Sequence, residues 1–91
     1  MIITQDRFFE GLAFEKCKFE YDFEKRDCYK GSDGGYYRVD HFGTSYVIEY
    51  AESEDEAKLN RFEDDDLYDD SIPEDELIAM IQKDLNEYVL Q

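Results

Sequence analysis

Carboxylates are the side chains of this sequence with the widest chemical potential, and they gather in one segment. Residues 49–76 contain 14 acidic and two basic residues, a net charge of −12. The whole chain of 91 residues has 25 acidic and 10 basic residues and a net charge of −15, so the rest of the chain is nearly balanced. Clustered carboxylates suit three kinds of chemistry: binding of a hard cation, acid/base catalysis, and contact with a basic macromolecule.

The sequence has few residues that suit catalysis. A nucleophilic mechanism needs a Cys or Ser beside a base, and a third group that orients the base. His41 is the only imidazole in the sequence, and its Asp-His-Phe context indicates a half-exposed position at a hairpin end. Paired carboxylates keep glycosidase-type chemistry open, but 91 residues leave little room for a substrate cleft beside a core. We therefore expect no enzymatic activity, no catalytic residues and no cofactor.

The acidic run suggests calcium, but its spacing does not fit a calcium loop. An EF-hand loop needs a Gly at its sixth position and a Glu at its twelfth. With Asp64 at the first position, Asp69 and Asp75 fall at the sixth and the twelfth. The Gly is missing, and His41 has no second imidazole with which to hold zinc. The sequence therefore predicts no metal site.

Contact with a basic protein is the chemistry that the acidic segment suits best. Concentrating like charges in 28 residues costs folding stability through self-repulsion, which scattered charges would lessen. Phe62, Leu67 and Tyr68 lie among the carboxylates and would give apolar anchors inside a charged rim. Nucleic acids and anionic membranes are excluded as direct partners because both need Lys or Arg. The predicted partner-binding residues are Glu54, Asp55, Glu63, Asp64, Asp65, Asp66, Leu67, Tyr68, Asp69 and Asp70.

The compartment follows from the cysteines and the N-terminus. Cys17 and Cys28 are too few and too isolated for the disulfide framework of a secreted miniprotein, so we expect reduced, at least partly buried thiols. Met1–Arg7 has no basic region followed by an apolar stretch, and no apolar run approaches the roughly 18 residues of a membrane span. We expect a cytoplasmic protein.

The first half of the chain must supply the scaffold for this surface. Hydrophobic residues make up 42% and aromatic residues 16% of the sequence, enough for one folded domain over residues 1–91. We expect a helix from Thr4 to about Lys16, capped by Thr4 and weakened by Gly11. A strand should follow, because apolar and charged residues then alternate. Its inward side chains would be those of Cys17, Phe19, Tyr21 and Phe23.

Further strands are expected in the middle of the chain. Arg26–Lys30 has the length of a short strand and is closed by a glycine-rich turn, Gly31–Gly35. Tyr36–Phe42 and Tyr46–Ala51 are rich in Tyr, Val and Ile and should form a hairpin. The second of them is almost continuously apolar, so we expect a central strand covered on both faces.

Two helices complete the prediction. Ser53 and Ser71 each begin a Ser-x-x-Glu capping box. The first helix should end near Phe62, and Glu63–Asp70 would be an acidic loop before the second. The expected fold is α+β, with an N-terminal helix, a three- or four-stranded antiparallel meander, a short helix and a C-terminal amphipathic helix. The apolar stripe of that last helix comprises Leu77, Ile78, Ile81, Leu85, Tyr88 and Val89.

Four segments give the sequence a resemblance to a known family: Gly34–Phe42, Tyr46–Glu52, Phe62–Tyr68 and Ser71–Leu85. Over about residues 30–86 the chain resembles the small acidic immunity proteins of bacterial polymorphic-toxin systems. The resemblance implies a protein that binds and neutralises a cognate toxin domain, often a nuclease, with the acidic segment meeting the toxin. The family has no catalytic or metal residues to transfer.

Two other functions remain open at this point. The chain is also similar in kind to phage-encoded anti-CRISPR proteins, which are short, very acidic and α+β, and which mimic nucleic acid on the DNA-binding surface of an effector. A non-inhibitory acidic adaptor is the third interpretation, because many charge runs only keep a protein soluble. Gene neighbourhood would separate the first two functions.

Overall fold

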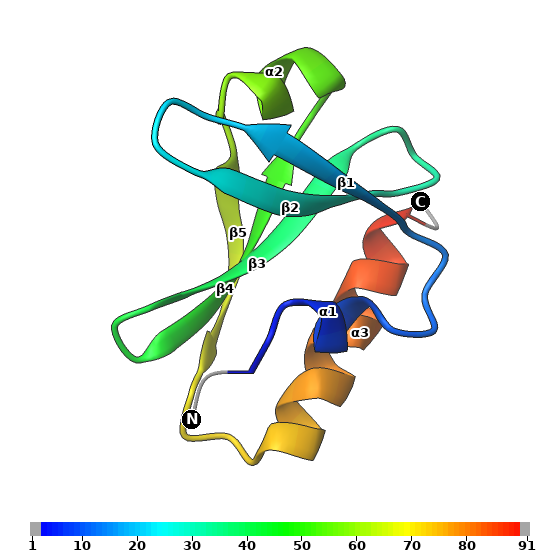
Figure 1. Ribbon diagram of the computed structural model, residues 1–91. Helices are drawn as coiled ribbons and strands as arrows, with labels where there is room; N and C mark the ends of the chain where they lie inside the picture. Colours follow the sequence, from blue (N-terminus) through cyan, green and yellow to red (C-terminus); the bar gives the residue numbers. More distant parts are fainter. Residues whose placement is uncertain (1–2, 90–91) are drawn as a thin grey trace.

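The computed structural model describes residues 3–89 as an α+β fold (Figure 1). The predicted fold class is confirmed, with an antiparallel meander of five strands in the order β1-β2-β3-β4-β5. The strands are β1 (Glu15–Glu20), β2 (Lys25–Lys30), β3 (Tyr36–Phe42), β4 (Ser45–Ala51) and β5 (Glu63–Asp69). The helices are α1 (Asp6–Phe9), α2 (Glu54–Lys58) and α3 (Glu74–Val89). No helix within residues 3–89 is long and apolar enough to cross a membrane.

The N-terminal helix is much shorter than its apolar spacing predicts. α1 has four residues instead of extending from Thr4 to about Lys16, and its N-cap is Gln5, whose side chain makes no capping hydrogen bond. Gly11 has a φ of +78°, a left-handed conformation that stops a helix. The chain after Gly11 is therefore free to enter β1 at Glu15.

The strand predicted to extend through Phe23 also ends early. Tyr21 and Glu24 close a two-residue hairpin turn, with N···O distances of 2.8 Å from Tyr21 to Glu24 and 3.4 Å in the reverse direction. Phe23 consequently lies at the tip of the β1–β2 turn and is 99% exposed, not on an inner face. Alternation of apolar residues continues past Glu20, but the pairing of the backbone does not.

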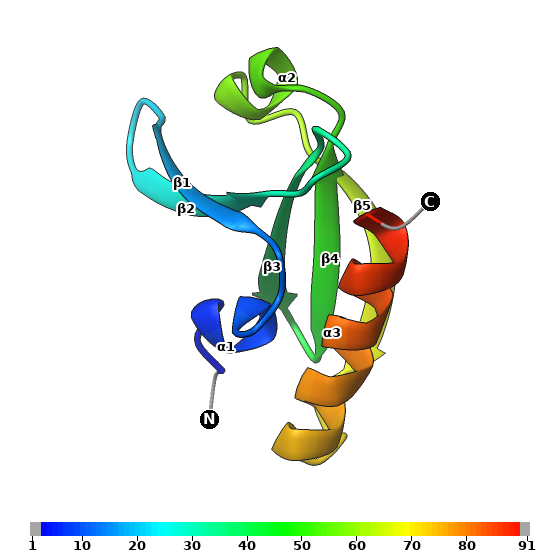
Figure 2. The same cartoon turned by 90° about the vertical axis from the view of Figure 1, so that its right-hand side faces the viewer.

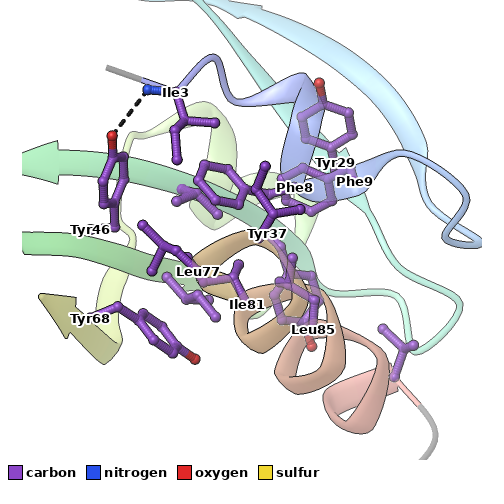
Figure 3. Packing of buried hydrophobic residues seen from close by; sticks show 14 residues of the cluster. Ile3, Phe8, Phe9, Tyr29, Tyr37, Tyr46, Tyr68, Leu77, Ile81 and Leu85 are labelled. Atoms are coloured by element: carbon purple, nitrogen blue, oxygen red, sulfur yellow. Dashed lines mark hydrogen bonds between the residues drawn. The ribbon is translucent and has the colours of Figure 1, made fainter. Parts of the chain in front are cut away.

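One face of the sheet is covered by α3 and α1, which both lie in front of it in Figure 2. The predicted stripe of α3 is confirmed, because all its members except half-buried Tyr88 are buried. They pack with Phe8 and Phe9 of α1 and with inward residues of the strands, and we call this cluster the main core. Figure 3 shows this packing, including the hydrogen bond from the Ile3 amide to the Tyr46 hydroxyl at 3.0 Å.

A second core lies on the other face of the sheet. β2 pairs with β3 only at Tyr29–Tyr37 and Lys30–Tyr36, so the β1–β2 hairpin diverges from β3 and crosses the direction of β4 and β5 (Figure 1). The hairpin folds toward α2. The residues of this second core are Cys28, Tyr36, Ala51 and Ala57, with Cys17, Phe19 and Phe62 beside them. β4 is thus covered on both faces, as its apolar sequence predicts.

The two predicted capping boxes have different outcomes. The Ser53 hydroxyl accepts a hydrogen bond from the Glu56 amide at 3.3 Å and caps α2, which ends at Lys58, before Phe62. Ser71 does not cap α3. That helix starts at Glu74, because the Pro73 carbonyl accepts its first hydrogen bond, from Leu77 at 2.9 Å.

Candidate protein-binding surface

Most of the predicted binding residues lie on a strand, and not in a loop as their composition suggested. β5 forms the edge of the sheet beside β4, with Leu67 opposite Val47 and Asp64 opposite Glu49. Its low intrinsic strand propensity is overcome because pairing with β4 satisfies the backbone, while the charged side chains stay in water at the edge. Every residue of β5 except Tyr68 is exposed. We call Glu63–Asp70 the acidic edge.

Tyr68 does not have the position predicted for it. It is 7% exposed, packs in the main core and donates its hydroxyl hydrogen to the Asp84 carboxylate of α3. Successive side chains of a strand point to opposite faces, so burial of Tyr68 turns Leu67 outward. Leu67 is 66% exposed. The surface therefore has one of the three predicted apolar anchors, because Tyr68 is a core residue and Phe62 is partly buried against the second core.

Some of the carboxylates of the acidic edge have structural partners. Asp66 accepts a hydrogen bond from Tyr88 of α3, and Asp70 lies 2.9 Å from His41. Partial burial, then the charges of Asp66 and Glu63, raise the pKa of Asp65. Hydrogen bonds from Ser71 lower the pKa of the Asp69 carboxyl. Glu63 and Asp64 face solvent at the start of the strand, next to α2.

The predicted set forms a long row instead of a compact patch. Because a strand rises about 3.3 Å per residue, the seven residues of β5 extend over roughly 20 Å. Glu54 and Asp55 are not on β5 but on the first turn of α2. Glu54 is paired with Lys58 at 3.7 Å, and Asp55 is exposed. An extended row of negative charge matches an extended basic surface.

The structure also contains an ionic network that the sequence patterns did not predict. The Arg38 Nε lies 2.9 Å from the Glu49 carboxylate, and its guanidinium stacks 3.8 Å above the Phe62 ring. Arg26 pairs with Asp40 on the same face. A hairpin register that pairs Phe42 with Ser45 puts Arg38 opposite Glu49, so the register was the signal that could have revealed the pair.

The two carboxyl groups of the network titrate differently. Burial, then the neighbouring Asp40, raise the pKa of Glu49 to about 7. Burial alone would also raise the pKa of Asp40, but contacts with Glu49 and Arg26 outweigh it and lower that pKa. Arg38 and Glu49 are each 5% exposed. The Arg38–Glu49 pair is thus buried against Phe62 beside the second core.

The two cysteines and the histidine are at least partly buried. Burial raises the pKa of the Cys28 thiol to about 12, so this thiol is a poor nucleophile. Cys17 and Cys28 are both free, and the predicted burial is confirmed, since Cys17 is half-buried and Cys28 is buried. His41 packs against Tyr46, with 4.6 Å between the ring centroids. Within residues 3–89, no three His, Cys, Asp or Glu side chains are grouped in a way that could hold a metal ion.

Comparison of the chain with protein-family models, with curated proteins and with solved structures gave no match. A function for this chain must therefore be argued from its sequence and from the geometry of residues 3–89.

Proposed function

We propose that this protein is a cytoplasmic immunity protein that binds a basic toxin domain, such as a nuclease, and neutralises it. The observation that carries the proposal is the acidic edge, whose carboxylates lie exposed along the open side of an edge strand with Leu67 among them. A row of this length supports contact with an elongated basic groove. In such a groove, carboxylates would stand where substrate phosphates bind.

Electrostatics also suits the kinetics that an antidote needs. Long-range attraction raises association rate constants from about 10⁵–10⁶ to as much as about 10⁸–10⁹ M⁻¹s⁻¹ at low salt. The antidote must reach the toxin before the toxin reaches its substrate, so the rate of encounter matters as much as the affinity. Leu67 would supply apolar contact once the partners meet.

The test uses the product of the gene adjacent to the one for this chain. Co-expression with that product should restore growth for the wild type and fail to do so for Glu63→Gln/Asp64→Asn. The control Glu10→Gln/Glu87→Gln removes the same charge from exposed positions outside the acidic edge and should still protect. With purified proteins, the edge variant should raise the Kd about tenfold or more, because each lost charge weakens a desolvated contact.

Two results would contradict the proposal. An equal loss in the edge variant and its control would mean that bulk charge matters and the acidic edge does not. Full protection by the edge variant would mean that the partner binds elsewhere.

A nucleic-acid-mimicking inhibitor of a DNA-binding protein, of the anti-CRISPR kind, is the second candidate. The length of the acidic row favours it, since a duplex also presents negative charge along a line. In that case a target effector would be displaced from this protein by DNA, and the adjacent gene would not be toxic. Toxicity of the neighbour, relieved by this chain, would exclude it.

A further inference from the structure

A groove lies between the β1–β2 turn and the end of α2. Its volume is about 440 Å³, and its walls are residues 20–24 and 58–60. The Tyr21 hydroxyl joins the two walls by donating a hydrogen bond to the Ala57 carbonyl at 2.6 Å. This hydrogen bond connects the β1–β2 turn with α2 in the closed fold, and the groove lies outside the acidic edge.

Two of the large apolar side chains that the fold leaves exposed line this groove. Phe23, on one wall, is 99% exposed, and Leu59, on the other, is 60% exposed. A side chain with almost all its surface in water contributes no burial to the core, so neither core explains Phe23. Exposed apolar residues that gather at a polar-rimmed hollow are typical of a protein-binding site, and an aromatic residue there is typical of a hot spot.

The rim of the groove is acidic. Glu20, Asp22 and Glu24 line it against a single cation, Lys58, which is itself paired with Glu54 at 3.7 Å. Lys25 lies 3.2 Å from Glu20, and Arg26 lies 4.0 Å from Glu24. Asp22 is therefore the rim carboxylate without an ion pair among the described residues. A second copy of this chain is a poor occupant, because each copy has a net charge of −15.

We propose that this groove is an anchor site for a partner protein that presents an apolar side chain flanked by Lys or Arg. The inference rests on the proposed function in taking the partner to be the same basic protein that meets the acidic edge. Phe23 and Leu59 hold the apolar side chain, and Asp22, the rim carboxylate without an ion pair among the described residues, holds a flanking cation. α2, whose end lines the groove, has Glu54, Asp55 and Glu56 in its first turn and precedes the acidic edge in the chain.

The chemistry of the site is tested with three hexapeptides, blocked at both ends, that are titrated into the labelled full-length protein and followed by amide NMR. The sequences are Lys-Lys-Leu-Phe-Lys-Lys, Glu-Glu-Leu-Phe-Glu-Glu and Lys-Lys-Gly-Ser-Lys-Lys. The first peptide should shift the amides of residues 20–24 and 58–60, and the other two should not. Its affinity, read from those amides, should fall about tenfold in Phe23→Ser and in Leu59→Ser.

Two variants control for the fold and for general stickiness. Phe23→Leu keeps an apolar side chain at the tip and should retain the affinity. Phe42→Ser removes another exposed aromatic residue, 55% exposed at the far end of the sheet, and should not change the shifts at the groove. All variants should melt at the wild-type temperature, because the replaced side chains are exposed.

Three results would overturn the proposal: binding of the acidic peptide at the groove with equal affinity, unchanged affinity in Phe23→Ser, or a dimer that Phe23→Ser dissociates. The last would identify a second copy as the occupant. The titration does not involve the toxin, so its failure is distinct from failure of the proposed function. In the growth assay, the edge variant could lose protection while Phe23→Ser still protects. That result would reject the groove as a binding site and leave the proposed function standing.

Discussion

The carboxylates around the main core and those of the acidic edge have the same chemistry and opposite tasks. Around the core, tyrosine hydroxyls donate to aspartates outside the acidic edge: Tyr29 to Asp6, Tyr37 to Asp33 and Tyr68 to Asp84. These acids let aromatic rings be buried while their polar tips stay satisfied. At the acidic edge, Glu63 and Asp64 have no such donor among the described residues. The density of acids along the sequence therefore does not distinguish carboxylates that accept structural hydrogen bonds from those that remain exposed without a donor.

The largest effect on stability should come from a substitution in the main core. Ile81 is fully buried between α3 and the sheet, so Ile81→Ala should lower the free energy of unfolding by about 2–5 kcal/mol. Urea denaturation measures this loss. Met80, the preceding residue of the helix, is 38% exposed, and Met80→Ala should cost far less. Equal losses would mean that α3 does not pack as described.

Next in size is a pH effect beneath the acidic edge. The pKa of Glu49 is about 7 in the folded protein, above its ordinary value of 4.5, so its proton stabilises the fold below pH 4.5 and that stabilisation is lost as the pH rises through 7. The lowered pKa of Asp40 acts at lower pH, where protonation of Asp40 removes stability. Between pH 5 and 8 the wild type should lose about 2 kcal/mol of unfolding free energy.

Glu49→Gln mimics the protonated side chain and should flatten that pH dependence. Urea denaturation at a series of pH values compares the two proteins. Asp64→Asn, across the β4–β5 pair from Glu49, is the control and should keep the slope of the wild type. A slope that Glu49→Gln leaves unchanged would assign the titration to another group.

A smaller effect should distinguish Tyr68 from Leu67, which were both predicted to be apolar anchors. Tyr68→Phe removes a hydroxyl that donates to Asp84 and should lower the free energy of unfolding by about 1 kcal/mol while leaving partner binding intact. Leu67→Ser should do the reverse, because Leu67 is exposed. Chemical denaturation and the Kd of the complex measure both. Loss of binding in Tyr68→Phe at unchanged stability would return Tyr68 to the interface.

The smallest change in stability is expected at the acidic edge itself. Glu63→Gln/Asp64→Asn should alter the free energy of unfolding by less than about 0.5 kcal/mol, because both side chains are exposed. The Kd of the wild-type complex should rise steeply between about 50 and 300 mM salt, and less steeply for the variant. A wild-type Kd that is insensitive to salt would favour the acidic adaptor instead.

Elements defined by their own residues could be predicted from the sequence, and elements defined by a neighbour could not. The stripe of α3 and the β3–β4 hairpin follow from local spacing, so both are present as expected. The acidic residues of β5 favour a loop, and only the open edge of β4 makes them a strand. The spacing of Phe8 and Phe9 favours a longer helix, which Gly11 and the start of β1 cut short.

The candidate surface shows the same division. Exposure of Glu63, Asp64 and Leu67 agrees with the prediction from composition. The position of Tyr68 depends on which side of β5 meets α3, and that follows from the register with β4, where Tyr68 lies opposite Tyr46. A loop has no alternation of faces, so interpreting the segment as a loop could not distinguish Leu67 from Tyr68.

The sparse pairing of β2 with β3 has a consequence for dynamics. Two residue pairs tie the β1–β2 hairpin to the rest of the sheet, whereas β3 and β4 pair along their whole length. Opening of the hairpin should therefore cost less than global unfolding, and its amide hydrogens should exchange with solvent before those of β3 and β4. Phe23 stands at the tip of that hairpin, so the wall that carries it can shift to fit a partner while the central strands stay closed.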